Sequence, residues 1–518
     1  MSAETPATKP SYELNEHGQK IWRNGTLTYT LGGLIVLFAI LLGGDLVFAM
    51  RNRSIQPSMQ ILFKVFNSPT WYYGLIAVSI PTAMGMLIAP VVSFWSDRHR
   101  SRWGRRIPFL LVSTPIVSAA MIGIGCSTMA VNFIQQFFPD LSTNVLMLAT
   151  LSITWLFFDV GAIVSGVIFM ALIKDVVPEC FFGRFMGLFR MVGLVAGIIY
   201  NYWIIGLVKV HYMYIFWSLG IIYGVAFFLI CLLIREGKYP PPPSPPPVPE
   251  RAGRFGVLLT NLEKGPFGPM LVYAKESFGS SYYVKVFLVL IPLGLMFVPI
   301  NAFIIFYADD LTAQGVMDNT ASFERALWAM LSFCGAGENQ VLFNRIANVI
   351  GMYDDGIGFF GKCSALTFVV SFFLAYPLGA LADRYHPLRC CLVVTVLAVI
   401  TYGVVAHIID SKLTFAIAVV AHNLISGVYW TVGMSLNLRL FPQARYAQFT
   451  SAAGLLDSVF MLAFFPLMAY FFDLIGKDYS YSFYMGMGIG IFSLVAAFFF
   501  MPHFKKHGGY NNYVAPEL

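Results

Sequence analysis

The sequence has little charge. Asp, Glu, Lys and Arg make up only 11% of the 518 residues, whereas hydrophobic residues make up 58%. A soluble domain usually carries about 25% charged residues. A water-soluble core could not cover this much apolar surface, so lipid must solvate a large part of the chain. The composition therefore excludes an ordinary soluble protein and predicts a membrane protein.

Patterns that would support chemistry on a metal, a nucleotide or a nucleic acid are also missing. The seven cysteines lie in or beside apolar segments, without the spacing of a zinc site or a disulfide framework, and are interpreted as packing residues. There is no nucleotide-binding loop, and the net charge of +7 forms no basic patch with interleaved aromatic residues. We therefore expect no enzymatic activity, no metal, no cofactor and no nucleic-acid partner.

Twelve stretches are long and apolar enough to cross a bilayer as helices, which satisfy their own backbone hydrogen bonds in lipid. In the first half they cover 27–50, 71–94, 107–130, 144–172, 185–208 and 212–234. In the second half they cover 284–307, 358–381, 389–409, 413–438, 450–473 and 480–502. The predicted fold class is an all-α polytopic membrane protein with two six-helix bundles, at 27–234 and 284–502.

The segments outside the bundles differ in character. Residues 1–26 and 503–518 are expected to be tails, and the polar first 25 residues lack the apolar core of a removable signal peptide. Residues 235–283 are expected to link the bundles, since 240–249 (PPPPSPPPVP) forms a stiff polyproline spacer. In the loop 308–357, two amphipathic stretches around Trp328 and Ile346 indicate short helices. This insert is expected to cap the mouth of the protein, to contact a partner, or to be purely structural.

Loop charge predicts the orientation. Residues 97–106 contain five arginines and one acid, so this loop is expected on the cytoplasmic side, together with both termini. The insert, with seven acids and two arginines, is then expected outside. Three basic residues conflict with this orientation, because Arg51, Arg53 and Lys64 fall in an expected external loop.

The two halves repeat short motifs at equivalent places, as transporters built from repeats do. Ser96-Asp97-Arg98 follows the second span, and Ala382-Asp383-Arg384 follows the eighth. We interpret these charged residues as gates that hold the inner ends of the spans together and release when the bundles rock. The predicted gate residues are Asp97, Arg98, Arg102, Arg105, Asp383 and Arg384.

Residues 96–108 (SDRHRSRWGRRIP) resemble the glycoside-pentoside-hexuronide symporters and the related sucrose-transporter group, both within the major facilitator superfamily. Gly44-Asp45, Asp159 and 377–379 add to the resemblance. It implies cation-coupled sugar transport. Where the melibiose-permease branch has two acids that help to bind sodium, this chain has Gly85 and Ala89. A hard cation would find too few oxygen ligands there, which favours protons over sodium.

An ionisable side chain inside a span costs roughly 2.5–3.5 kcal/mol on insertion scales, so it is expected to have a function or a partner. The resemblance implies that Asp159 takes part in coupling. Desolvation makes a carboxylate take up a proton more readily, which agrees with this role. Arg190 is expected to neutralise Asp159 when its proton leaves. A structural salt bridge is the alternative.

The substrate site is expected to lie at the midplane, between the two bundles. Asp45, expected near the outer end of the first span, matches an acid that contacts sugar in melibiose permease. Trp155 lies one helical turn from Asp159, where its ring can stack on a sugar. Asp457 is a weaker candidate. The predicted substrate-binding residues are Asp45, Trp155, Asn301, His422 and Asn423.

The sequence thus predicts a proton-coupled sugar symporter that works by alternating access. Its substrate is expected to be a glycoside or a disaccharide such as sucrose. The expected partners are the sugar, the coupling cation and the lipid of the cell membrane, with the protein as a multi-pass monomer. An uncoupled facilitator, a sodium-coupled symporter and a transporter-like sugar sensor are the alternatives.

Overall fold

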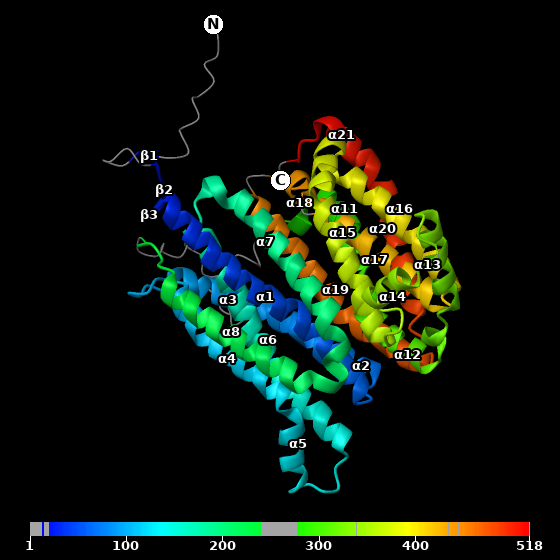
Figure 1. The fold of residues 1–518 in the computed structure, drawn as a ribbon. Coiled ribbons are helices and arrows are strands. Elements are labelled where there is room, and N and C mark those ends of the chain that lie inside the picture. The colour runs from blue at the N-terminus through cyan, green and yellow to red at the C-terminus, as the bar shows by residue number, and fades with distance from the viewer. Residues whose placement is uncertain are drawn as a thin grey trace, which may run out of the picture.

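The computed structural model describes residues 13–14, 20–239 and 277–516, except 338, 434, 443 and 444. Two groups of long helices lie side by side (Figure 1). The predicted polyproline segment at 240–249 lies outside the described residues.

The N-terminal bundle contains six spans. Its helices are α1 (Leu31–Val65), α2 (Thr70–Gly74), α3 (Ile80–Arg98), α4 (Ile107–Gly125), α5 (Ser127–Gln135), α6 (Thr143–Val176), α7 (Glu179–Ile199) and α8 (Val208–Leu233). A π-helix, η1 (Leu75–Ser79), joins α2 to α3 as one span. The π-helix η2 (Tyr200–Ile204) and the 3-10 helix η3 (Ile205–Leu207) form the turn between α7 and α8.

The C-terminal bundle also contains six spans. Its helices are α11 (Ser281–Leu295), α12 (Val298–Ala313), α13 (Ala321–Phe333), α14 (Gln340–Val349), α15 (Gly356–Tyr385), α16 (Pro387–Ile408), α17 (Lys412–Gly433), α18 (Leu436–Leu440), α19 (Tyr446–Leu474), α20 (Tyr481–Lys506) and α21 (Gly509–Asn512). A 3-10 helix, η4 (Val316–Asp318), follows α12. The seventh span is broken between α11 and α12, after Pro292 has removed one backbone donor.

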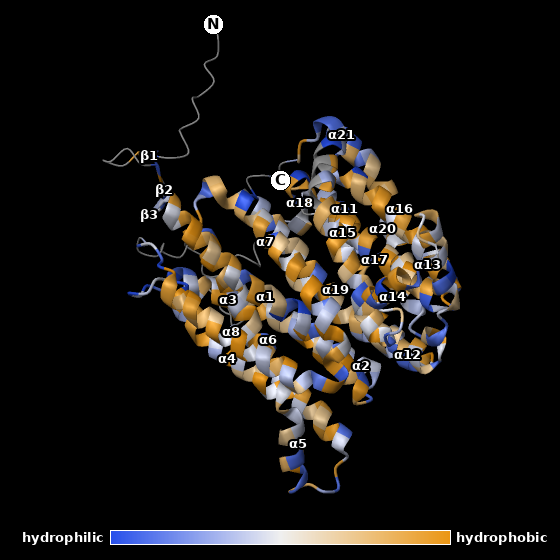
Figure 2. Ribbon diagram, in the orientation of Figure 1, coloured by the Kyte–Doolittle hydropathy of each residue, from blue (hydrophilic) through white to orange (hydrophobic). Residues whose placement is uncertain are grey.

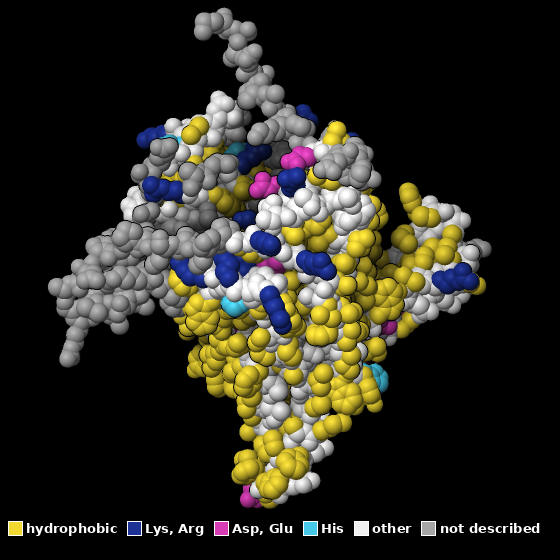
Figure 3. All heavy atoms as spheres, turned by 90° about the vertical axis from the view of Figure 1, so that its left-hand side faces the viewer, with side chains coloured by type: hydrophobic (Ala, Val, Ile, Leu, Met, Phe, Trp, Pro, Cys, Tyr) yellow, Lys and Arg dark blue, Asp and Glu magenta, His cyan; other side chains and the backbone are white. Residues whose placement is uncertain are grey.

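The prediction of twelve spans is confirmed. Eleven stretches of the described residues are long and apolar enough to cross a membrane, and one of them, Glu179–Leu233, contains both α7 and α8. Each bundle has an apolar core that extends across the interface to some residues of the other bundle, and many large hydrophobic side chains are exposed. Figure 2 shows hydrophobic residues along the helices of both bundles, and Figure 3 shows a broad apolar surface below a band of Lys and Arg. This is the surface that lipid covers.

The first span is much longer than predicted. It was expected to end at residue 50, but α1 is 35 residues long and ends at Val65. Arg51 and Arg53 therefore lie inside a helix and not in an external loop, which removes most of the conflict in loop charge. The helix continues through these polar residues because they face other helices and a cavity, not water at the membrane surface.

The two ends of the bundles differ. The first and last described elements, β1 and α21, lie at one end, named here the terminal end, and α5 projects from the opposite end, named the loop end (Figure 1). The bundles contact each other mainly through segments near the loop end: α2, η1, η2 and η3 of the first bundle against α15 and α19 of the second. Whether the terminal end is cytoplasmic stays a prediction.

Two further structural elements lie outside the spanning helices. The predicted amphipathic helices around Trp328 and Ile346 are confirmed as α13 and α14, whose shared core includes a stacked Trp328–Phe343 pair with ring centroids 4.3 Å apart. The insert begins after Ala313, because α12 continues past residue 308. At the N-terminus, a small antiparallel sheet that was not predicted pairs β1 (Glu13–Leu14), β2 (Lys20–Asn24) and β3 (Leu27–Thr30).

His386 forms the tight elbow between α15 and α16. Its backbone adopts φ 63°, and its Nδ1 accepts a hydrogen bond from the Leu388 N–H at 3.2 Å, which caps α16. The side chain is only 5% exposed and packs against aromatic rings near the C-terminus. Burial, with a smaller effect of Arg439, lowers the pKa of His386 to about 4.

The lowered pKa of His386 predicts an acid-dependent loss of stability. The folded state favours the neutral ring, so this stabilisation is complete above the unfolded pKa of about 6.5 and is lost as pH falls towards 4. We expect a cost on the order of 1–3 kcal/mol over this window, measured as a fall in the melting temperature of purified protein. His386→Asn, which keeps a capping side chain and tolerates positive φ, should flatten this pH dependence. An identical slope in the variant would contradict the assignment to His386.

Candidate functional site

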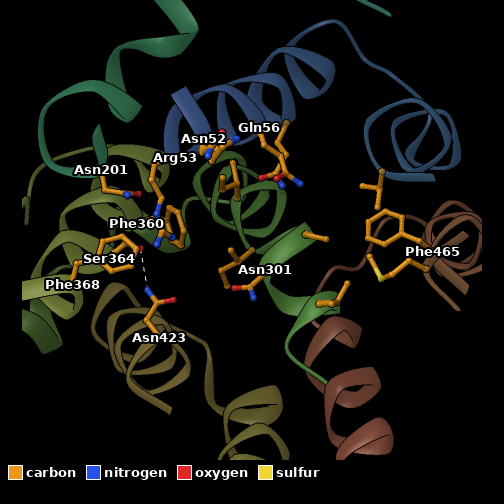
Figure 4. Close-up of a pocket in the computed structure, with 18 residues that line it drawn as sticks. Asn52, Arg53, Gln56, Asn201, Asn301, Phe360, Ser364, Phe368, Asn423 and Phe465 are labelled. Carbon is orange, nitrogen blue, oxygen red and sulfur yellow. Dashed lines mark hydrogen bonds between the residues drawn. The ribbon is translucent and has the colours of Figure 1, made fainter. Parts of the chain in front are cut away.

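A cavity of about 380 Å³ lies between the two bundles (Figure 4). One wall is α1, which faces α12, α15 and α17 across the cavity. Its polar lining residues are Asn52, Arg53, Gln56, Gln60, Asn201, Asn301, Ser364 and Asn423. A volume of this size is within the range of small-molecule sites.

The polar stripe of α1 follows from helical spacing. Asn52, Gln56 and Gln60 are each four residues apart, so they lie on one face of the helix. Asn52, Arg53 and Gln56 are exposed although they lie in the middle of a membrane span. The surface that they expose is the wall of the cavity.

The opposite wall is preorganised by hydrogen bonds. The Asn423 amide donates to Ser364 Oγ at 3.1 Å. His422 lies behind the wall, 2% exposed, with its Nε2 3.0 Å from Asn301 Oδ1 and its Nδ1 2.9 Å from the Tyr402 hydroxyl. The structure therefore places Asn301 and Asn423 on the cavity, whereas His422 orients Asn301 from behind.

A second cavity of about 380 Å³ adjoins the first and shares Asn52 and Gln56 with it. Asp159 and Trp155, both on α6, line this second cavity. Asp159 Oδ2 and Trp155 Nε1 are buried there without a hydrogen-bond partner. Buried polar atoms usually have partners, so the Asp159 oxygen is available to a proton or a donor of a ligand, and the Trp155 N–H to an acceptor of a ligand.

Arg51 is the arginine that accompanies Asp159, and the two side chains interact electrostatically in the second cavity. Its Nη1 donates to Ser165 Oγ at 2.7 Å and to the Tyr223 hydroxyl at 3.2 Å. Arg190, the predicted partner of Asp159, instead donates to Thr431 Oγ1 of the other bundle at 2.6 Å. Sequence reasoning missed Arg51 because it placed this residue in a loop.

Asp45 is not where the sequence placed it. It lies near the middle of the 35-residue α1, 1% exposed, and not near the outer end of the span. It is absent from the described linings of both cavities, and its Oδ2 has no hydrogen-bond partner. The structure therefore brings Asp159 and Trp155 together, and Asn301 with Asn423, but sets Asp45 apart from both pairs.

The loop end is closed by polar contacts between the bundles. The Asp473 carboxylate of α19 accepts hydrogen bonds from the Thr70 and Trp71 N–H groups, at 3.0 and 2.8 Å, and so caps α2 of the other bundle. Two ion pairs, Lys64–Asp310 and Lys209–Asp309, also cross between the bundles. A glycine contact completes the closure: a Cβ on Gly361 of α15 would lie 2.3 Å from the Asn201 carbonyl oxygen.

The charged network described at the terminal end joins helices of the first bundle. Asp175 of α6 accepts from Arg105 at 2.7 and 3.0 Å and from Arg106 at 3.1 Å. Asp97 of α3 pairs with Arg106 at 2.5 Å. Glu236 accepts from three successive backbone N–H groups, of residues 105–107, at the start of α4. These contacts join α3, α4 and α6 to one another at the terminal end.

The remaining predicted gate residues have separate environments. The Arg98 guanidinium lies over the Phe94 ring at 3.6 Å, and that of Arg102 lies 5.9 Å from the Trp103 ring. Arg384 is exposed, 5.4 Å from the ring of Tyr385. The side chain of Asp383 lies outside what the structure describes. A gate role for all six residues stays a prediction.

Removal of the Asp175 carboxylate is expected to destabilise the first bundle. Asp175→Asn leaves Arg105 and Arg106 without their shared anion, and loss of one partner of a buried ion pair costs ~3 kcal/mol. We expect a marked fall in melting temperature in detergent. Lys174→Gln is the matched control, because this neighbour is exposed, and it should melt like wild type. Equal melting of the two variants would contradict the structural role.

Known proteins resemble this arrangement. The model of the Major Facilitator Superfamily matches residues 329–511. The inward-open xylose transporter XylE from E. coli has 12% sequence identity and a TM-score of 0.53, with 90% of this chain and 95% of that chain covered. A peptide transporter, POT, in complex with sulfate has 12% identity and a TM-score of 0.58, with 93% and 97% covered. At this identity the structures establish the fold alone.

Two six-helix bundles around a shared polar cavity define a polytopic membrane protein with the major facilitator fold. Over residues 329–511 the chain is similar to the Major Facilitator Superfamily, and the solved structures show the same fold over 90% or more of the chain.

Similarity to curated relatives is restricted to short segments. "Sucrose transport protein SUC3" of Arabidopsis thaliana is 28% identical over 123 residues, which is 23% of this chain and 19% of the relative. "Sucrose transport protein SUT1" of Oryza sativa is 32% identical over 100 residues, or 19% and 17%. "Proton-associated sugar transporter A" of Homo sapiens is 34% identical over 85 residues, or 16% and 10%. The chain thus matches a fifth or less of the length of these relatives.

Proposed function

We propose that this protein is a secondary active transporter that moves a sugar across the membrane by alternating access, coupled to protons. The polar cavity between the two bundles, closed at the loop end by contacts across the bundle interface, carries this proposal. A carrier needs a binding site that both bundles build, so that rocking of one against the other changes which side has access. The named functions of the short-segment relatives, sucrose transport and proton-associated sugar transport, support sugar as the substrate.

Asp159 is the proposed proton carrier. Its Oδ2 is buried without a partner in the second cavity, next to the sugar-sized first cavity, and Arg51 stabilises the carboxylate after the proton leaves. Trp155 lines the same cavity as Asp159, where sugar binding and protonation can influence each other. Protonation of Asp159 is expected to favour loading, and the loaded carrier then rocks.

The test is uptake of labelled mono- and disaccharides, sucrose first, into proteoliposomes that contain the purified protein. Accumulation above equilibrium under an imposed proton gradient supports proton symport. If the sugar only equilibrates across the membrane, whatever ion gradient is imposed, the protein is an uncoupled facilitator. If only a sodium gradient drives accumulation, the transporter is coupled to sodium. Saturable sugar binding without uptake would overturn the proposal in favour of a sensor.

A further inference from the structure

We propose that the substrate is a sugar that carries a negatively charged group, a carboxylate or a phosphate, and that Arg53 binds this group. This inference rests on the proposed function, in which the first cavity is the transport site. It departs from the sucrose named in the curated relatives, because sucrose has no charged group.

The charge inventory of the first cavity is the first argument. Eighteen residues line it, and among them Arg53 is the charged one; the described lining contains no carboxylate. The other polar groups are the amides of asparagine and glutamine and the Ser364 hydroxyl. In Figure 4 the Arg53 side chain extends from α1 towards Phe360 and Phe368, and its guanidinium lies 5.4 Å from the Phe368 ring centroid.

The surroundings of Arg53 give the second argument. The described interactions of Arg53 include no ion pair, and the charged group with which it interacts electrostatically is Arg190, another cation. The nearby carboxylate of Asp159 lines the second cavity, where Arg51 already compensates it. Arg53 is exposed to a cavity that membrane-spanning helices surround, and an arginine at this depth is costly unless an anion accompanies it. The ligand is therefore expected to supply that anion.

The geometry of the Arg53 guanidinium gives the third argument. A guanidinium presents a fork of N–H donors that binds a carboxylate or a phosphate in a bidentate manner. The amides of Asn52, Gln56, Asn301 and Asn423 surround it and can both donate to and accept from hydroxyl groups. One charged anchor among several amides suits a polyol with one acidic substituent.

The first experiment needs no knowledge of the sugar. A Gln56→Cys thiol, introduced after the exposed Cys180 and Cys334 are changed to serine, reports the potential in the cavity. Its reaction rates with an anionic and a cationic methanethiosulfonate reagent are compared. We expect Arg53→Gln to lower the ratio of anionic to cationic rates by about tenfold or more. Arg345→Gln, in the exposed face of α14, is the control and should leave the ratio unchanged. An unchanged ratio in Arg53→Gln would overturn the inference.

The second experiment identifies which acidic group of the sugar, a carboxylate or a phosphate, the cavity binds. Glucose and galactose are compared with glucuronate, galacturonate and glucose 6-phosphate as protectants of the Gln56→Cys thiol and as uptake substrates. We expect an acid to protect at concentrations at least about tenfold below its neutral counterpart, and Arg53→Gln to abolish this difference. The uronates and the phosphate separate the two kinds of anion, and Arg53→Lys should retain part of the effect because it keeps the charge. Failure of every acid to protect would overturn the assignment.

The two proposals fail in different ways. Accumulation of a neutral sugar at equal rates by wild type and Arg53→Gln would overturn the acidic substrate and leave the proposed transporter intact. An acid that binds through Arg53 but never crosses the proteoliposome membrane would overturn transport and leave the anion site intact.

Discussion

Asp159→Asn is expected to abolish proton-driven accumulation of the sugar while sugar-for-sugar exchange continues. Asparagine has nearly the same shape as aspartic acid but cannot bind and release a proton, so the loaded state no longer depends on the proton gradient. The accumulation ratio in proteoliposomes should fall from above equilibrium to about one, because only coupling can drive transport uphill. The ratio is measured under an imposed pH gradient, and exchange is measured with labelled sugar on one side and unlabelled sugar on the other.

Asp457→Asn is the matched control for this result. It removes another carboxylate from a spanning helix, but Asp457 is exposed on α19 and is not among the described residues that line either cavity. Its accumulation ratio should match wild type. Full accumulation by Asp159→Asn would contradict the role of Asp159 as the proton carrier, and loss of exchange as well would indicate a site for the sugar instead.

Gly361→Val is expected to prevent closure of the loop end and to reduce transport by about 100-fold. A Cβ at this position would lie 2.3 Å from the Asn201 carbonyl oxygen and 2.3 Å from the Ile205 Cγ2 atom, both in the other bundle. Backbone contacts this short cannot be relieved by a side-chain rotation. A steric cost of roughly 3 kcal/mol against the closed state would shift the population of that state by about 100-fold.

Two measurements check the Gly361 prediction. Uptake gives the rate, and labelling of Gln56→Cys by an impermeant reagent, added from each side of oriented vesicles, gives the side from which the cavity is open. The variant should admit reagent from the loop end, whereas wild type in the closed state should not. Gly488→Val on α20 is the control, because a Cβ there meets no atom within 4 Å beyond the neighbouring turns of its own helix. Transport by Gly361→Val at the wild-type rate would show that the contact is not part of the cycle.

The sequence predicted those elements whose hydrophobic pattern lies within a single segment of the chain. The apolar stretches predicted the twelve spans, and the amphipathic pattern around Trp328 and Ile346 predicted α13 and α14. The structure places Asn301 and Asn423, from the seventh and tenth spans, on the same cavity wall. Their inward position follows from the rule that isolated polar residues in spans turn towards the interior, and their role in substrate binding stays a prediction.

The first span shows why the polar cavity residues of α1 were not predicted. An apolar stretch ends at the first run of polar residues, so residues 51–60 looked like a loop, although they continue α1. The four-residue spacing of Asn52, Gln56 and Gln60 was the available signal, since it describes one helical face and not a loop. Two of the three basic residues that conflicted with the predicted orientation, Arg51 and Arg53, were in fact cavity residues.

Partners across the fold could not be predicted from local patterns. Arg51 lies more than 100 positions from Asp159 in the sequence, and Arg190 lies 241 positions from its hydrogen-bond partner Thr431. Either arginine could have accompanied Asp159 on the basis of charge alone. The contacts of Arg51 with α6, and of Arg190 with α17, decide between them.

An anionic substrate bound by Arg53 would change which part of the proton gradient drives its uptake. A neutral sugar that enters with one proton moves one positive charge, to which a membrane voltage contributes about 2.3 kcal/mol per 100 mV. A singly charged acid that enters with one proton moves no net charge, so its uptake is silent in an electrical recording. If Arg53 binds such an acid, the pH difference across the membrane drives its accumulation. The membrane voltage then has no influence on the accumulation ratio of the sugar.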